Sequence, residues 1–172
     1  REFIRTLDDL PLPAYDLFPL DKYELQVTAY KVLPTFTVVA SRGCPYNCTF
    51  CQVKQLLGPV MRLKSPEKLL TELLHLKQQY GARGIMFQDS TFTYDRDWVM
   101  QLCRCLIAEK LDLSWMCYTR ADKVDRELLR TMKQAGCSGI SYGVESANQK
   151  SLDLLKKNIQ IERIIESIEM SM

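Results

Sequence analysis

Short apolar runs alternate with helical patterns along most of the chain, and this alternation restricts the possible folds more than any other feature of the sequence. The runs are rich in β-branched and aromatic residues, as strands are. We expect strands at 35–40, 84–88, 113–118 and 139–143. We expect helices at 65–81, 95–110, 125–135 and 149–157, and a further apolar helix face at 161–168.

Strands that alternate with helices at this spacing form parallel βαβ units, whose right-handed crossovers curl the sheet toward a barrel. We therefore predict an α/β fold: a parallel, partial (β/α) barrel of the TIM type, truncated to about four βα units, over residues 35–172. A complete barrel of this kind takes about 250 residues. Residues 1–34, which contain prolines at 11, 13, 19 and 34, are predicted to form an extended lead-in arm or linker. The chain starts without Met and ends inside a helical pattern, so we expect a piece of a longer protein.

Composition excludes some classes of function. The 172 residues carry a formal net charge of only +2, which gives no strong signal for binding nucleic acid or an anionic membrane. No apolar run is long enough to span a bilayer, and no secretion signal is evident, so a cytoplasmic location is expected. The seven cysteines are then expected to be reduced thiols, metal ligands or catalytic groups rather than disulfides.

Parallel α/β folds bind ligands at the carboxyl ends of their strands. The loops at 41–65, 89–94, 119–124 and 144–148 should therefore form the active face.

The first of these loops contains Cys44, Cys48 and Cys51, three thiols within eight residues. Thiolates so close together suit an iron–sulfur cluster or zinc. A structural zinc site needs a fourth ligand, and no matching cysteine pair follows, so the site keeps an open position. A non-catalytic zinc-binding or scaffold module remains the alternative.

The Cys-x-x-x-Cys-x-x-Cys spacing, with Phe50 before the last cysteine, resembles the radical S-adenosylmethionine (SAM) superfamily, and the resemblance extends over 35–157. It is closest in pattern to the cobalamin-associated and methylthiotransferase-like branches. The resemblance implies a [4Fe-4S] cluster on the three cysteines, with SAM bound at the iron that has no cysteine ligand. It also implies an external electron donor and reductive cleavage of SAM to a 5′-deoxyadenosyl radical, for hydrogen abstraction or group transfer on an unknown substrate.

The segment 10–19 resembles the linker that follows a cobalamin-binding domain in such proteins. Cobalamin, held by a domain outside this chain, and cobalamin-dependent methyl transfer are therefore further expectations from the resemblance.

The resemblance also implies roles for two charged residues. Asp89 stands in the loop that receives the SAM amino group, and Arg120 matches an arginine that could hold the SAM carboxylate through two hydrogen bonds. The alternatives are that Asp89 caps the turn before Phe92 and that Arg120 forms a surface pair with Asp122 or Asp125.

Residues 143–146 resemble the Gly-x-Glu-Ser segment of these branches, where Glu145 would lie near the SAM ribose hydroxyls and Gly143 would allow close approach. Glu145 could instead be a helix N-terminal acid. Tyr46 and Phe50 are predicted to flank the cluster and adenine, or to be ordinary packing residues.

The remaining cysteines, Cys103, Cys105, Cys117 and Cys137, are predicted to be small buried residues. His75 is predicted to be a surface or core residue rather than a ligand. Because further barrel units are expected, the exposed sheet edge is predicted to favour self-association.

Overall fold

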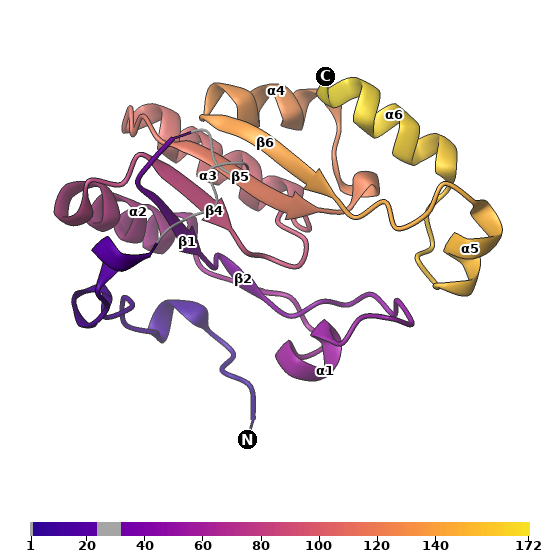
Figure 1. Ribbon diagram of the computed structural model, residues 1–172, viewed down its shortest axis with the longest axis horizontal. Helices are drawn as coiled ribbons and strands as arrows, with labels where there is room; N and C mark the ends of the chain where they lie inside the picture. The colour runs from indigo at the N-terminus through magenta and orange to yellow at the C-terminus, as the bar shows by residue number, and fades with distance from the viewer. Residues whose placement is uncertain (1, 24–31) are drawn as a thin grey trace.

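A computed structural model describes residues 2–23 and 32–172, and its centre is a parallel sheet of four strands (Figure 1). Residues 24–31, which belong to the predicted arm, lie outside the described residues. The strands are β1 (Thr35–Val38), β4 (Gly84–Phe87), β5 (Ser114–Thr119) and β6 (Cys137–Tyr142), and they pair in that order. The predicted α/β class and parallel sheet are confirmed, and the four strands form an open sheet rather than a closed barrel.

The register of these strands aligns their carboxyl ends. Val38 of β1 pairs with Phe87 of β4, which pairs with Cys117 of β5. All four residues of β4 are buried, as expected for a strand covered on both faces. In Figure 1 the arrowheads of β5 and β6 point toward the side of the molecule that holds α1 and α5.

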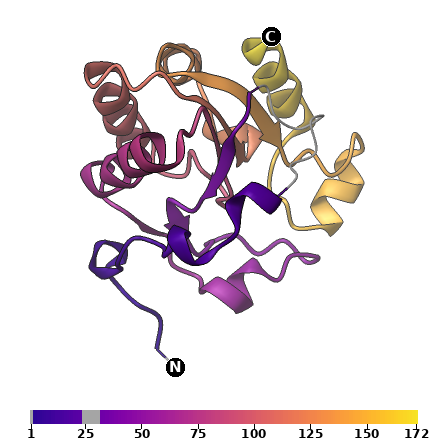
Figure 2. The same cartoon turned by 60° about the vertical axis from the view of Figure 1, so that its left-hand side comes forward.

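Three capped helices cover one face of the sheet (Figure 2). They are α2 (Pro66–Tyr80), α3 (Arg96–Ala108) and α4 (Arg126–Gln134). The side chains of Ser65, Asp95 and Asp125 accept hydrogen bonds from the first-turn amides of these helices, respectively, as N-caps do. Gly81 ends α2 in the left-handed conformation at φ 64°, where a residue without Cβ is favoured.

An aromatic cluster forms the centre of the core between the sheet and these helices. Phe87 stacks on Phe92 with ring centroids 4.6 Å apart, and Trp115 packs edge-on against Phe87. The indoles of Trp98 and Trp115 donate 2.7 Å hydrogen bonds to the carbonyls of Lys64 and Ala135. Each buried N–H is thereby satisfied, which makes burial of the large rings favourable.

The segment 41–65, expected to be a single loop, has structure of its own. It begins with β2 (Ser41–Arg42), which pairs antiparallel with β3 (Arg62–Leu63), and between them lies α1 (Val53–Leu57). Both strands have only two residues, too few for the period-2 pattern by which strands are identified from sequence.

The carboxyl-terminal helices differ in length from the expected ones. Helix α5 (Gln149–Leu154) ends three residues earlier than predicted, and α6 (Ile161–Ser171) follows after a short turn. A second small core of Ala121, Leu152, Ile159 and Ile164 packs these helices against the turn after β5. No helix in the described parts of the chain is long and apolar enough to cross a membrane.

The other cysteines are only partly as predicted. Cys103 and Cys117 are buried as predicted, whereas Cys105 and Cys137 are of intermediate exposure, so the prediction of buried residues is wrong for these two. Cys105 lies near the end of α3 on its partly solvated side, and Cys137 begins β6, the edge strand of the sheet. His75 packs against the rings of Tyr15 and Tyr80.

The amino-terminal arm is not simply extended, because its described part contains three 3-10 turns (Leu7–Asp9, Tyr15–Leu17 and Leu20–Lys22). Leu7 is buried, and Asp8 accepts a hydrogen bond from the amide of Ser65 at 2.8 Å. The Tyr15 hydroxyl donates to buried Glu72 of α2 at 3.0 Å, and Glu72 also pairs with Lys64. The arm is therefore attached to the core by buried polar contacts.

Replacing Tyr15 with phenylalanine should lower the free energy of unfolding by about 1 kcal/mol, because the hydrogen bond to Glu72 is lost while the ring is kept. Urea denaturation measures this change. Tyr23→Phe, at an exposed ring, is the matched control and should have almost no effect. Equal effects of the two substitutions would contradict a stabilising role for the buried contact.

Candidate active site

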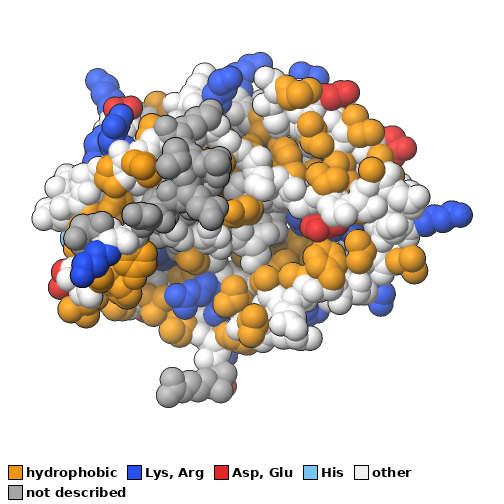
Figure 3. Space-filling model, in the orientation of Figure 1, with side chains coloured by type: hydrophobic (Ala, Val, Ile, Leu, Met, Phe, Trp, Pro, Cys, Tyr) orange, Lys and Arg blue, Asp and Glu red, His pale blue; other side chains and the backbone are white. Residues whose placement is uncertain are grey.

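A pocket of about 220 Å³ lies at the carboxyl edge of the sheet and gathers side chains from all four predicted active-face loops. Its lining includes eight of the nine residues predicted from the sequence: Cys44, Tyr46, Cys48, Phe50, Cys51, Arg120, Gly143 and Glu145. In Figure 3, hydrophobic side chains are spread over this face of the molecule, with charged side chains between them.

The cysteine loop is held in a hairpin by backbone contacts. Gly43 has φ 104°, and a Cβ there would lie 2.0 Å from the carbonyl oxygen of Val60, so only glycine allows the two sides of the hairpin to approach this closely. The Cys44 amide donates to Gly58 O at 3.1 Å. On the far side, the Thr49 amide donates to Leu155 O at 3.0 Å, which connects the loop to the end of α5.

The three thiols share one pocket without the arrangement of a mononuclear metal site. None of the cysteines in the described parts of the chain forms a disulfide. Within residues 2–23 and 32–172, no group of three or more His, Cys, Asp or Glu side chains is placed to hold a metal ion. Burial raises the pKa of Cys44, although a backbone hydrogen bond involving Tyr46 and the charge of Arg120 act in the opposite direction.

Asp89 lies beneath this loop rather than in the pocket lining. Its side chain is 3% exposed, and its carboxylate accepts hydrogen bonds from the Ser41 hydroxyl at 2.5 Å and the Ala40 amide at 3.3 Å. Neighbouring Ser90 and Thr91 line the pocket instead. The predicted contact with a SAM amino group, and the alternative of a cap before Phe92, therefore have no support from this geometry. Asp89 holds the base of the cysteine hairpin.

The pair with Asp122 that the alternative interpretation expected is present, but Arg120 is buried in the pocket wall rather than at the surface. It is 4% exposed, and it donates two hydrogen bonds to Asp122, at 2.8 and 2.9 Å, and one to the carbonyl of Lys157 at 2.9 Å. Its Nη1 has no hydrogen-bond partner among the described residues. The guanidinium also stacks on the ring of Tyr46, 3.9 Å from the centroid. Both N–H groups of Nη1 are thus unpaired among the described residues.

The stacking of Tyr46 on Arg120 connects the cysteine loop to the end of β5. Burial raises the pKa of Tyr46 to about 12, although the positive charge of Arg120 lowers it. The phenol is therefore neutral at physiological pH. Phe50 is half exposed at the pocket rim, where it forms an apolar wall.

Glu145 pairs with Lys157, a pocket residue that sequence reasoning missed. Lys157 Nζ donates to Glu145 Oε1 at 2.9 Å, and both side chains line the pocket. The sequence places Lys157 at a predicted helix end, where a lysine is usually exposed to solvent. Only the structure, in which Lys157 is 5% exposed, identifies it as a buried pocket residue. Asn148, rather than Glu145, caps α5.

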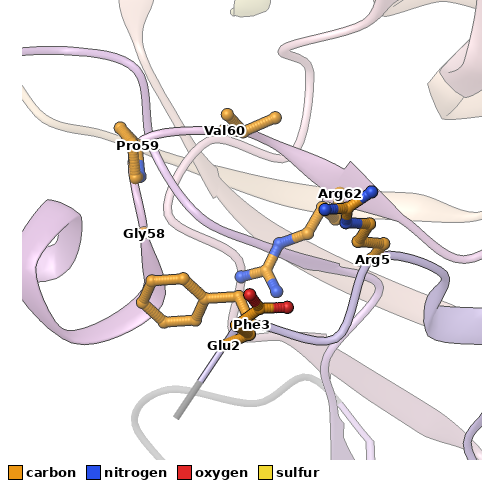
Figure 4. A pocket seen from close by; sticks show the side chains of 7 residues that line it. All are labelled: Glu2, Phe3, Arg5, Gly58, Pro59, Val60 and Arg62. Carbon is orange, nitrogen blue, oxygen red and sulfur yellow. The ribbon is translucent and has the colours of Figure 1, made fainter.

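A second pocket, of about 510 Å³, lies between the amino-terminal arm and the outer side of the cysteine hairpin (Figure 4). Arg62 stacks on Phe3 at 5.0 Å and donates to the carbonyl of Ile4 at 2.6 Å. The arm thus supports the hairpin from outside. None of the predicted site residues lines this pocket.

The comparisons with known proteins agree on one family. The model of the Radical SAM superfamily matches residues 38–171. The chain is 33% identical over 169 residues to an uncharacterized methyltransferase of Pyrococcus horikoshii, covering 98% of this chain and 36% of that protein. It is 31% identical over 165 residues to the cytidylyl-2-hydroxyethylphosphonate methyltransferase of Streptomyces wedmorensis, covering 91% of this chain and 30% of that protein. The chain thus spans about a third of the length of these relatives.

Among solved structures, the fold is similar to that of TsrM, a radical S-adenosylmethionine methyltransferase from Kitasatospora setae. The TM-score is 0.73 at 19% identity, and the match covers 79% of this chain and 28% of that one. This likeness supports the fold.

Asp89 should make stability depend on pH. Burial raises its carboxyl pKa to about 6, partly offset by the hydrogen bonds from Ser41 and Ala40. Between about pH 4, the usual pKa, and pH 6, the folded state keeps a proton that the unfolded state has released. The free energy of unfolding should therefore fall as pH rises through this window, by roughly 1–3 kcal/mol.

Denaturation of the wild-type protein and of Asp89→Asn at several values between pH 3.5 and 7 gives the free energy of unfolding of each as a function of pH. The difference between the two proteins measures the contribution of Asp89. A difference that is constant with pH would show that Asp89 titrates normally.

Proposed function

The chain belongs to the radical SAM superfamily, and we propose that it holds a [4Fe-4S] cluster through Cys44, Cys48 and Cys51 and binds SAM in the adjoining pocket. The residues present fit these groups. The three thiols form no disulfide and line one pocket.

The observation that carries the proposal is that Arg120, whose buried Nη1 has no hydrogen-bond partner among the described residues, lines the same pocket as the three thiols. A buried cationic donor without a partner is unfavourable, so such a donor indicates a missing anionic acceptor. The carboxylate of SAM supplies one. Asp122 and the Lys157 carbonyl already hold the other side of the guanidinium, which fixes the direction of the free donor.

Once bound, the cluster would supply the electron that cleaves the SAM sulfonium into methionine and a 5′-deoxyadenosyl radical. The chain's own residues orient SAM and limit water around it. Tyr46 and Phe50 provide apolar walls, and Glu145 provides an acceptor for the ribose hydroxyls. Asp89 acts as a positioning residue, because it fixes the start of the cysteine hairpin through Ser41.

For the whole protein we propose methyl transfer, the activity named for both sequence relatives and for the structural neighbour described above. Cobalamin held outside this chain would be the methyl carrier, as solved structures of similar fold contain bound cobalamin. An external one-electron donor would reduce the cluster.

Anaerobic reconstitution with iron and sulfide tests the cluster. The wild-type chain should become brown, with sulfur-to-iron charge-transfer absorption and about four irons per chain, because each iron except one has a cysteine ligand. Cys48→Ala should lose most of this absorption, whereas Cys105→Ala, a partly exposed thiol on α3, should keep it. A colourless wild-type protein with one zinc per chain would contradict the proposal and support the zinc-binding alternative.

Arg120→Gln should weaken binding of S-adenosylhomocysteine to the reconstituted chain by roughly 10–100-fold, as expected for loss of a charged hydrogen bond. Equilibrium dialysis measures the affinity. Affinity for 5′-deoxyadenosine, which has no carboxylate, should change little. Arg104→Gln, at an exposed position on α3, is the control. Equal weakening for both ligands would indicate a general disturbance of the pocket instead of a carboxylate contact.

A further inference from the structure

Lys157 is a buried charge that the proposed function does not use, although it lies in the wall of the proposed SAM pocket. We propose that Lys157 is a positioning residue: its ammonium group holds Glu145 so that one carboxylate oxygen faces a vicinal diol of the bound nucleoside. This inference rests on the proposed function and deepens it, because it assigns discrimination of the ribose to a residue pair.

The backbone at the end of α5 fixes where Lys157 lies. The Lys157 amide donates to Leu152 O at 3.0 Å, and the Lys156 amide donates to Asp153 O at 3.0 Å. These two bonds form a Schellman motif, in which the left-handed position falls on Lys156, at φ 52°. Asn158 is also left-handed, at φ 53°. The chain thus reverses sharply here and turns Lys157 back into the protein.

The side chain of Lys157 reaches Glu145 across a glycine. A Cβ at Gly143 would lie 2.9 Å from Lys157 Nζ and 2.8 Å from Glu145 Oε1, so the absence of a side chain at 143 makes room for the ion pair. Glu145 is itself left-handed, at φ 63°, a conformation that is uncommon for residues other than glycine and frequent at functional sites.

The pair leaves one acceptor available. Lys157 occupies Oε1 of Glu145, and Oε2 has no hydrogen bond among the described residues. The Glu145 side chain is 32% exposed and lines the pocket, so Oε2 is open to a ligand. Carboxylate oxygens are good acceptors for hydroxyl groups. Without the Lys157 ammonium group, the Glu145 side chain could rotate away toward solvent.

The same turn also supports Arg120, but through a different atom. The backbone carbonyl of Lys157 accepts a hydrogen bond from Arg120 Nη2, so this bond does not involve the Lys157 side chain. A side-chain substitution at 157 should therefore disturb the diol contact at Glu145 and leave the carboxylate contact at Arg120 in place. This difference separates a positioning role from general damage to the pocket.

The test compares S-adenosylhomocysteine with its 2′-deoxy analogue, using equilibrium dialysis against the reconstituted chain. The wild-type protein should prefer the ribose form by roughly tenfold, as expected for one charged hydrogen bond. Lys157→Met keeps the length of the aliphatic stem and should lose most of this preference, while its affinity for the 2′-deoxy form stays within about threefold of wild type. Lys156→Met, at the exposed neighbouring position, should keep the full preference.

A double substitution tests whether Lys157 affects the ribose preference through Glu145. In a Glu145→Gln background, Lys157→Met should change the preference no further, because Lys157 acts through Glu145. Retention of the preference in Lys157→Met would overturn this inference alone. Failure of the wild-type protein to bind either ligand would overturn the proposed function and the inference with it. Circular dichroism and thermal melting of each variant show whether it is folded.

Discussion

In a parallel sheet, strands that run in one direction also end at one edge, and the pocket exists because of this constraint. The ends of β1, β4, β5 and β6 each lead into a loop that contributes to the pocket or to its support. Cysteines from the first loop, an arginine from the third and a glutamate from the fourth thereby meet, although Cys44 and Glu145 are about a hundred positions apart. The parallel pairing of the four strands brings these distant segments to one edge of the sheet.

The cysteine loop is held from several directions. Asp89 holds its start through Ser41, and the carbonyl of Leu155 accepts from Thr49 near its middle. The amino-terminal arm supports its outer side through Arg62. These supports explain why a loop of about twenty residues with little regular structure can present three thiols to one pocket.

Two buried basic side chains and their acidic partners set which groups of a ligand the pocket can accept. Arg120 and Lys157 are almost fully buried, and each has an acidic partner, Asp122 and Glu145, respectively. Burial of an ion pair costs desolvation, so such pairs are weak evidence for stability and stronger evidence for a site. One guanidinium nitrogen and one carboxylate oxygen remain unpaired among the described residues, and these two groups suit the two ends of an amino-acid-bearing nucleoside.

Local features of the sequence were enough to predict the alternation of strands and helices, the starts of three helices near residues 65, 95 and 125, and the grouping of the cysteine loop with Arg120 and Glu145. These features depend on periodicity, on neighbours three residues away and on the general rule for strand ends. The burial of Asp89, the two-residue strands β2 and β3 and the place of Lys157 were decided by tertiary structure. Asp89 contacts Ser41 48 positions away, and Arg120 contacts the Lys157 carbonyl 37 positions away. Contacts over such separations leave no periodic signal, because they arise only when packed strands and turns bring the two segments together.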